Sequence, residues 1–320
     1  MSVDAPASTA AVEQPVGEAL ALFPGMAAAF PGMGQTLAGV PAADRAYAEF
    51  SEVSGADVAG LACRASEGEL LADRSWELAV VATEAAAYEA WRDAGHDVGA
   101  SLGFSIGSYA ALLAAGMVTV RQVVGMIDAV LQASRRLPGC FSMLGVVGAP
   151  VDKVAALCRE GGAELAAVIA PGQLLVAGIA TAVAELAEAV APVALKVATL
   201  SVRWPLHTSL MLPVAEELER HRERLGPLQP CRHPVYSALH GRRIGSPQEG
   251  WQLLVEHLHR TQRFDLAFGA ARREGFTRCV ELGPGRTLEH AVRWLSHGEV
   301  EVQAFPGEAA HPGRDAVKTW

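Results

Sequence analysis

The sequence lacks several features that define other classes of protein. No apolar run in its 320 residues has the length and purity of a membrane-spanning helix, so we expect no membrane partner. Residues 1–19 contain no Lys or Arg, so the positively charged start of a secretory signal peptide is missing. The five cysteines are far apart and form no C-x-x-C pair, so their spacing does not support a zinc site. We therefore expect reduced thiols in a cytoplasmic protein.

Positive charge is also scarce: 26 Lys and Arg stand against 35 Asp and Glu, which gives a net charge of −9. Because phosphate contacts dominate nucleic-acid affinity, this balance argues against a nucleic-acid partner. Apolar residues are abundant, at 51% of the chain, and indicate a large buried core in one large domain or two moderate ones. Residues 1–20 are rich in Ala, Ser, Pro and Glu, and we expect a disordered leader there.

The most informative stretch is Gly103-Phe104-Ser105-Ile106-Gly107, a G-x-S-x-G pattern. A small-residue stretch with strand character precedes it, and an Ala- and Leu-rich helix over 109–115, closed by Gly116, follows it. Strand, sharp turn and helix are the context of a nucleophile elbow, which holds a serine at a helix N-terminus. Bulky side chains in place of the two glycines would clash with the neighbouring strand and helix. The alternative is that a chain with 32 glycines contains the pattern by composition alone.

The elements around the motif indicate an α/β protein. A first strand is expected over 26–30, running into Pro31-Gly32-Met33-Gly34. Residues 23–26 are a near copy of this segment, but only the second copy continues as G-x-G, which lets a backbone approach a ligand closely. Helices are expected over 41–53, 67–72, 78–94, 120–136, 210–224, 251–259, 265–274 and 287–295, strands over 234–239 and 279–282, and a tail after residue 306.

Residues 138–199 differ from the rest of the chain because short strands and helices alternate there. Strands are expected over 143–147, 165–169, 174–177 and 193–199, and helices over 151–160 and 181–190. The order β-α-β-β-α-β is that of a ferredoxin-like domain, inserted in the larger one.

A serine nucleophile needs a base, and the chain has ten histidines. His207 stands in an apolar loop before a helix N-cap, where an imidazole could be aimed at a neighbouring active site. His290, on a helix after a Gly-Pro-Gly loop, is the main rival. Two others lie beside turn glycines, His96 and His240. The rest are expected on the solvated surface: His221, His233, His257, His259, His297 and His311.

Six segments share a wider pattern: 30–34, 105–116, 143–148, 171–173, 205–211 and 281–285. They match, in order, the motifs F-P-G-Q-G, G-H-S-x-G-E-Y-x-A-L-x-A-A-G, M-x-x-V-x-G, S-P-G-Q, P-x-H-S-x-L-M and E-x-G-P-G. Over about residues 26–295 the chain thus resembles the malonyl-CoA:acyl-carrier-protein transacylase family, the acyltransferases of fatty acid and polyketide synthesis. The resemblance implies an α/β-hydrolase-like large domain, over 21–137 and 200–320, with the ferredoxin-like small domain over 138–199 inserted in it.

The resemblance also implies a ping-pong mechanism. His207 would deprotonate Ser105, which attacks an acyl thioester, and a phosphopantetheine thiol would then take the acyl group from the serine. The backbone N–H groups of Met33 and Ile106 would hold the oxyanion. A backbone carbonyl near Arg260 would orient the histidine. No metal or redox cofactor is required, and the substrates carry phosphopantetheine or CoA.

The chain departs from the family pattern in its expected substrate pocket. The family's arginine on the helix after the elbow, which pairs with a malonyl carboxylate, falls at Val130. Its histidine before the serine is Phe104, and its glutamine on the helix before the elbow is Glu77. The residues before His207 also differ from those that accompany malonyl choice, at Trp204, Pro205 and Leu206.

These changes make the pocket more apolar, so we expect a monocarboxylic or amino-substituted acyl group, with Glu77 facing any ammonium. The alternative is neutral sequence drift at these positions, with Arg135 or another basic residue taking the place of the missing arginine. The expected partner is an acidic acyl carrier protein, which a basic patch would attract; candidates are Arg203, Arg260, Arg263, Arg286 and Arg293, although each could be an ordinary solvated arginine.

Three other functions remain open at this stage. An acyl-carrier-protein hydrolase would share Ser105 and His207 and differ in admitting water. Ordinary malonyl transfer would require another cation in place of the missing arginine. A non-catalytic docking protein is disfavoured because Ser105 and His207 are both present.

Overall fold

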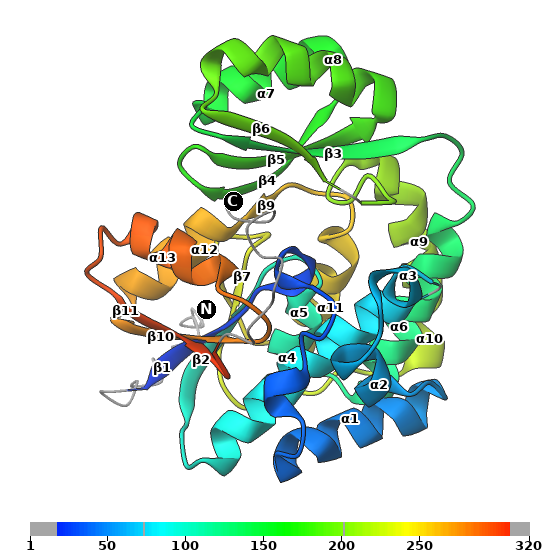
Figure 1. Ribbon diagram of the computed structural model, residues 1–320, viewed down its shortest axis with the longest axis vertical. Helices are drawn as coiled ribbons and strands as arrows, with labels where there is room; N and C mark the ends of the chain where they lie inside the picture. Colours follow the sequence, from blue (N-terminus) through cyan, green and yellow to red (C-terminus); the bar gives the residue numbers. More distant parts are fainter. Residues whose placement is uncertain (1–17, 73, 201, 308–320) are drawn as a thin grey trace, which may run out of the picture.

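The computed structural model describes residues 18–72, 74–200 and 202–307, and they form two sheets with helices on their faces (Figure 1). The larger sheet has the order β11-β10-β1-β2-β7-β8, and all neighbouring pairs are parallel except β7 and β8. Its strands are β1 (Ala19–Phe23), β2 (Val98–Gly103), β7 (Val235–Ser237), β8 (Arg242–Ile244), β10 (Arg278–Leu282) and β11 (Glu301–Phe305).

Helices cover both faces of this sheet because its central strands are apolar on both sides. On β1, Ala21 and Phe23 face one helical layer, while Leu20 and Leu22 face the other. The first layer comprises α1 (Pro41–Ser54), α2 (Val58–Cys63), α3 (Glu67–Leu70), α4 (Ser75–Asp93), α5 (Gly107–Ala114), α6 (Val120–Ser134), α9 (Leu212–Arg220), α10 (Arg222–Leu225) and α11 (Pro247–Glu256). The second comprises α12 (Phe264–Arg273) and α13 (Thr287–Leu295).

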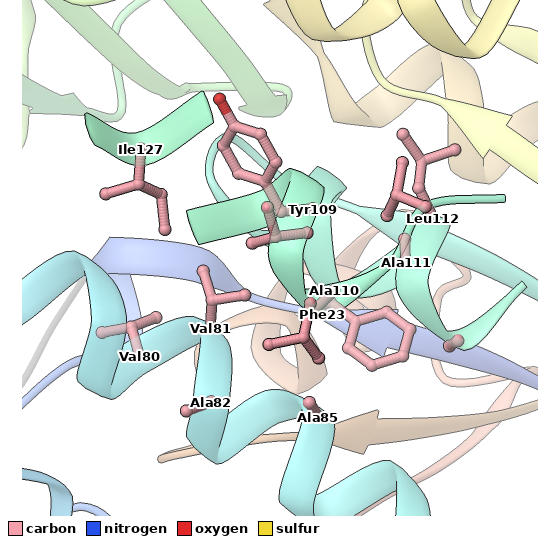
Figure 2. Packing of buried hydrophobic residues seen from close by; sticks show 14 of the residues in the cluster. Phe23, Val80, Val81, Ala82, Ala85, Tyr109, Ala110, Ala111, Leu112 and Ile127 are labelled. Atoms are coloured by element: carbon pink, nitrogen blue, oxygen red, sulfur yellow. The ribbon is translucent and has the colours of Figure 1, made fainter. Parts of the chain in front are cut away.

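Alanines let the central helices approach one another closely. Figure 2 shows Ala82 and Ala85 of α4 beneath Ala110 of α5, with Phe23 of β1 beside them. The chain also has short 3-10 helices, η1 (Gly25–Ala28), η2 (Gln35–Leu37), η3 (Ala191–Val193) and η4 (Ser209–Met211).

The smaller sheet has the order β6-β3-β5-β4-β9, from β3 (Phe141–Val147), β4 (Glu164–Ala170), β5 (Gln173–Ile179), β6 (Lys196–Leu200) and β9 (Gln262–Arg263). Helices α7 (Val151–Gly161) and α8 (Ala180–Val190) pack on one face. The other face shares a core with α12, α13 and the larger sheet. The first four strands come from one continuous segment, whereas β9 is supplied by the chain beyond it and pairs in parallel with β4.

The structure corrects several expectations about elements. The first strand is 19–23 and not 26–30, so the expected leader ends before Ala19, and Gly25–Ala28 is a 3-10 helix. The sequence analysis did not predict α2, β8, β9 or β11, which are short elements with little periodic signal. The remaining leader (1–17) and the end of the tail (308–320) lie outside the described residues.

Candidate active site

Ser105 sits on a sharp turn between β2 and α5, as the G-x-S-x-G pattern predicts. Its backbone φ is 55°, in the left-handed region that non-glycine residues rarely adopt. A Cβ on Gly103 would clash with the Gly107 backbone, and one on Gly107 would clash with the Phe23 carbonyl. The two glycines therefore let the turn pack closely against the start of α5 and the end of β1.

His207 lies beside Ser105, as expected for a candidate base. Its Nε2 lies 2.9 Å from the Ser105 Oγ, and its Nδ1 lies 2.5 Å from the backbone carbonyl oxygen of His257. A carbonyl can only accept, so Nδ1 carries the proton and Nε2 is left to accept from the serine hydroxyl. The His207 backbone N–H also donates to the carbonyl of Leu258, at 2.7 Å, and its φ is 66°.

Burial sets the charge of this histidine. His207 is 4% exposed, and burial lowers the pKa of its imidazole to about 4, against the opposing effect of the hydrogen bond to His257. The ring is therefore neutral at physiological pH, which is the form that can accept a proton from Ser105.

Strand β4 of the smaller sheet holds the segments on both sides of this base. The Glu164 carboxylate accepts from the Ser209 backbone N–H at 2.9 Å and also from its hydroxyl. The Thr261 hydroxyl donates to the Leu165 carbonyl at 2.8 Å, just before the β9 pairing. Both segments that place the imidazole are thus attached to one strand.

The loop beside Ser105 is the first F-P-G-M copy, which the sequence analysis set aside. The backbone N–H of Phe104 donates to the Phe23 carbonyl at 2.9 Å, so residues 24–26 lie against the elbow. The backbone N–H of Gly25 donates to the buried Glu84 carboxyl at 2.6 Å. Met26 follows and lines the cavity at Ser105.

Met33 does not line the cavity at Ser105, and its backbone N–H donates to the Phe30 carbonyl at 3.1 Å, so the expectation that placed an oxyanion donor there is corrected. Its side chain is 2% exposed and packs in the helical core, while the next residue, Gly34, donates its backbone N–H to the Ala62 carbonyl. The second copy continues as G-x-G, but it follows a 3-10 helix and not a strand end.

A cavity of about 70 Å³ opens at Ser105. Four of the five predicted pocket residues line it: Glu77, Val130, Trp204 and Leu206. Phe104 does not. Its ring is 2% exposed and lies edge-on to Phe264 in the core between the sheets, because successive residues leaving β2 point to opposite faces. The other lining residues are Met26, Ser105, Ile106, Tyr109, Ile127, Leu131, His207, His257 and Leu258.

The sequence analysis missed two polar residues of this cavity, Tyr109 and His257. His257 was expected on the surface but is 2% exposed and lies beside His207, with ring centroids 6.0 Å apart. The expectation of an orienting carbonyl near Arg260 was the only signal for it. His233 was also expected on the surface but is mostly buried, with Nε2 2.7 Å from the Ser101 Oγ, whereas the rival base His290 is exposed.

The predicted docking arginines lie mostly on the surface. Arg203 is exposed beside Trp204, and Arg260 is exposed and paired with Glu256. Arg263 is half-buried and binds Asp265 through two hydrogen bonds, of 2.9 and 2.7 Å. Arg286 and Arg293 are exposed and both pair with Glu289, at 3.3 and 2.9 Å. Four of these five positive charges are therefore partly neutralised by acidic neighbours.

Within the part of the chain that the structure describes, no cluster of three or more His, Cys, Asp or Glu side chains could hold a metal ion. Over the same residues, no helix is long and apolar enough to cross a membrane.

Comparison with solved structures identifies the fold. The malonyl-transacylase of a type II polyketide synthase, solved with its acyl carrier protein, superposes with a TM-score of 0.86 over 91% of this chain and 97% of that one, at 24% identity. The acyltransferase domain from the second module of the salinomycin polyketide synthase gives a TM-score of 0.82 over 91% of this chain and 69% of that one, at 29% identity. The two sheets and their helices thus form the mixed α/β fold of malonyl-transacylase structures.

Sequence comparison adds the family. The model of the acyl transferase domain matches residues 21–309. A malonyl CoA-acyl carrier protein transacylase of Bacillus subtilis (strain 168) is 29% identical over 281 residues, which are 85% of this chain and 88% of that protein. The chain belongs to the acyl transferase domain family, and it is an acyltransferase similar to the malonyl-CoA:acyl carrier protein transacylases.

Proposed function

We propose that this protein transfers an acyl group from an acyl thioester to the phosphopantetheine of an acyl carrier protein in polyketide biosynthesis, through an acyl-Ser105 intermediate. One observation carries the proposal: the Ser105 Oγ lies 2.9 Å from the Nε2 of a neutral His207 whose Nδ1 is held by the His257 carbonyl. This arrangement is that of an activated nucleophile whose base is oriented by a third group.

In the first half-reaction His207 takes the Ser105 proton as the oxygen attacks the thioester carbonyl. The backbone N–H groups of Ile106 and Met26 hold the oxyanion, and the donor thiol leaves with a proton from His207. The second half-reaction reverses these steps with the carrier-protein thiol as nucleophile. Met26 replaces Met33 in this role because it lines the cavity at Ser105. No step needs a metal or redox cofactor.

We further propose that the acyl group is not a dicarboxylic one. Among the described residues that line the cavity there is no Lys or Arg, and Val130 occupies the helix face where an arginine would pair with a carboxylate. Burying a carboxylate without a partner costs several kcal/mol. Glu77, on the cavity wall, favours an amino-substituted acyl group, because a carboxylate attracts an ammonium.

The carrier protein would dock beside the cavity at Ser105, where Arg203, Arg260, Arg263 and Arg286 are candidate contacts. The names of the similar transacylases support an acyl carrier protein as partner. We also class the fold as an α/β-hydrolase-like domain with a ferredoxin-like insertion. The support is the mostly parallel larger sheet and the order fourth-first-third-second of the four strands within 138–199.

The test measures covalent acylation of Ser105 by intact mass. The donors are malonyl-CoA and the butyryl and 3-aminobutyryl thioesters, which share one chain length and differ in the amino group. We expect both monocarboxylic groups to load faster than malonyl, and no loading of Ser105→Ala. A malonyl adduct formed as readily as the others would contradict the substrate proposal. Free acid released without an acceptor thiol would instead identify a hydrolase.

A matched pair of variants at position 130 tests the missing cation. Val130→Arg is expected to raise malonyl loading relative to butyryl loading about tenfold or more, because it supplies a charged hydrogen-bond donor. Val130→Leu keeps the wall apolar and should leave the ratio low. Equal ratios in the two variants would show that position 130 does not select the acyl group.

A further inference from the structure

The cavity contains two polar side chains that the proposed mechanism does not use. The imidazole of His257 is 2% exposed, and the hydroxyl-bearing ring of Tyr109 is 3% exposed. Among the described residues, the Tyr109 hydroxyl has no hydrogen-bond partner, and the His257 ring has only the Ser105 backbone close to it. Only the backbone carbonyl of His257 serves His207, so its side chain is available for another task.

These two side chains face the same small space. Their ring centroids are 5.8 Å apart in an edge-to-face arrangement, and both line the cavity that begins at Ser105. Figure 2 shows the Tyr109 hydroxyl directed away from α4, on the side of Ile127. Most of the remaining wall is apolar, from Ile127 and Leu131 among others.

Both groups are uncharged. Burial, together with the nearby His207 and His259, lowers the pKa of His257 to about 3 against the opposing effect of the Ser105 backbone, and burial raises the pKa of Tyr109. The imidazole therefore offers one donor and one acceptor, and the phenol offers both through a single oxygen. Buried polar groups left without partners cost free energy, so a ligand that satisfies them gains affinity over one that does not.

We propose that His257 and Tyr109 form a polar subsite in the acyl pocket, which binds an uncharged substituent that both donates and accepts hydrogen bonds, such as a hydroxyl group, on the acyl chain carried by Ser105. This inference rests on the proposed function, since it assigns the acyl chain of that same intermediate. It is separate from Glu77, which would face a charged amine.

The experiment compares Ser105 loading from N-acetylcysteamine thioesters of butyrate and of each enantiomer of 3-hydroxybutyrate, followed by intact mass. The wild-type protein is expected to load one 3-hydroxybutyryl enantiomer about tenfold faster than butyryl. Tyr109→Phe and His257→Leu should each bring that ratio close to one. His257→Gln, which still donates and accepts, should retain most of the preference.

Tyr88→Phe is the matched control, because it removes the same oxygen from a buried tyrosine of α4 that does not line this cavity. It should keep the wild-type ratio. Circular dichroism verifies that each variant folds. If His257→Leu does not fold, Tyr109→Phe alone tests the subsite.

Three outcomes overturn the subsite and are distinguishable. A wild-type ratio near one would show that water alone satisfies the two groups. Equal losses for both substrates in Tyr109→Phe and His257→Leu would assign them a structural role. In both cases Ser105 still loads, so the acyltransferase proposal survives. Absence of loading from every thioester would instead overturn the proposed function and the subsite with it.

Discussion

Ser105 and His207 both hold their backbones in the left-handed region, at φ of 55° and 66°. Such conformations cost about 1–3 kcal/mol each and persist where the surroundings fix them. Here the surroundings are the tight packing at Gly103 and Gly107 on one side, and the hydrogen bonds from His207 to residues 257 and 258 on the other. The reacting atoms are thus positioned before any substrate binds.

The buried state of His207 predicts an unusual pH profile. Because its pKa is lowered to about 4, the imidazole stays neutral well below the range of an exposed histidine. The acylation rate of Ser105 should therefore change little as pH falls from 8 to about 5, and it should decline as pH approaches 4. Initial rates by intact mass, with circular dichroism at each pH, test this. A decline centred near pH 6.5 would contradict it.

For single residues, the sequence predicted functional positions where a chemically suitable residue stands in a distinctive local pattern. The G-x-S-x-G pattern placed Ser105, whereas the apolar loop before a helix cap made His207 one candidate beside His290, and the family resemblance selected it. His257 could not be found this way, because it lies among charged residues at the end of α11 and is buried only by tertiary packing.

Among the elements, the loop after β1 depends on a single buried carboxyl. Glu84 of α4 is 0% exposed and accepts from the Gly25 backbone N–H. Burial and the nearby Glu281 raise the pKa of Glu84 well above its usual value, against the hydrogen bond from Gly25. It packs under Gly283 of the loop after β10 as well, so one side chain joins α4 to two strand ends.

Replacing this carboxyl should affect catalysis through the loop. Glu84→Leu leaves the Gly25 N–H without its acceptor, at a cost of about 1–3 kcal/mol, and should lower kcat for acylation more than it raises KM. Glu84→Gln keeps a hydrogen-bond acceptor of the same shape and should retain most of the activity. Stability by urea denaturation and acylation kinetics are measured together. Equal kinetics for the two variants would refute a positioning role.

The same loop shows why the sequence misplaced an element. Two copies of F-P-G-M offer the same local signal, and the choice between them depends on which one follows a strand. The all-apolar 19–23 is that strand, buried on both faces, but such a run without alternation resembles any other short apolar stretch. Helix α4, by contrast, was predicted to within three residues at its start, because its periodicity extends over many turns.

For the molecule as a whole, the two sheets share one hydrophobic core around Phe264. This ring is 0% exposed, lies parallel to Phe268 at 6.2 Å and stands edge-on to Phe104 at 6.1 Å. The same cluster contains Leu102 of the larger sheet and Leu175 of the smaller one. We therefore expect the two sheets to unfold together if this core is lost.

Phe264→Ala should lower the free energy of unfolding by about 3–5 kcal/mol, since it removes a large buried side chain. It should also slow Ser105 acylation, because Phe104 precedes the nucleophile. Leu266→Ala, on the same helix but 46% exposed, should change stability by less than about 0.5 kcal/mol. Urea denaturation measures both. Two separate transitions in the wild-type protein would contradict a shared core.

The order of elements predicted within 138–199 agrees with the structure, since those elements are regular and local. The sequence could not show that this segment's sheet includes β9, a two-residue strand whose partner lies far away in the chain. Pairing of that kind depends on the tertiary arrangement and leaves no periodic trace.

Strand β4 holds residues on both sides of the base, Ser209 through Glu164 and Thr261 through Leu165. Residues 138–199 therefore help to position Ser105 and His207 relative to each other, in addition to covering the larger sheet. A tilt of the smaller sheet against the larger one would alter the 2.9 Å distance between His207 and Ser105 directly. A carrier protein that contacts the smaller sheet would thus be linked to Ser105 and His207 through these hydrogen bonds.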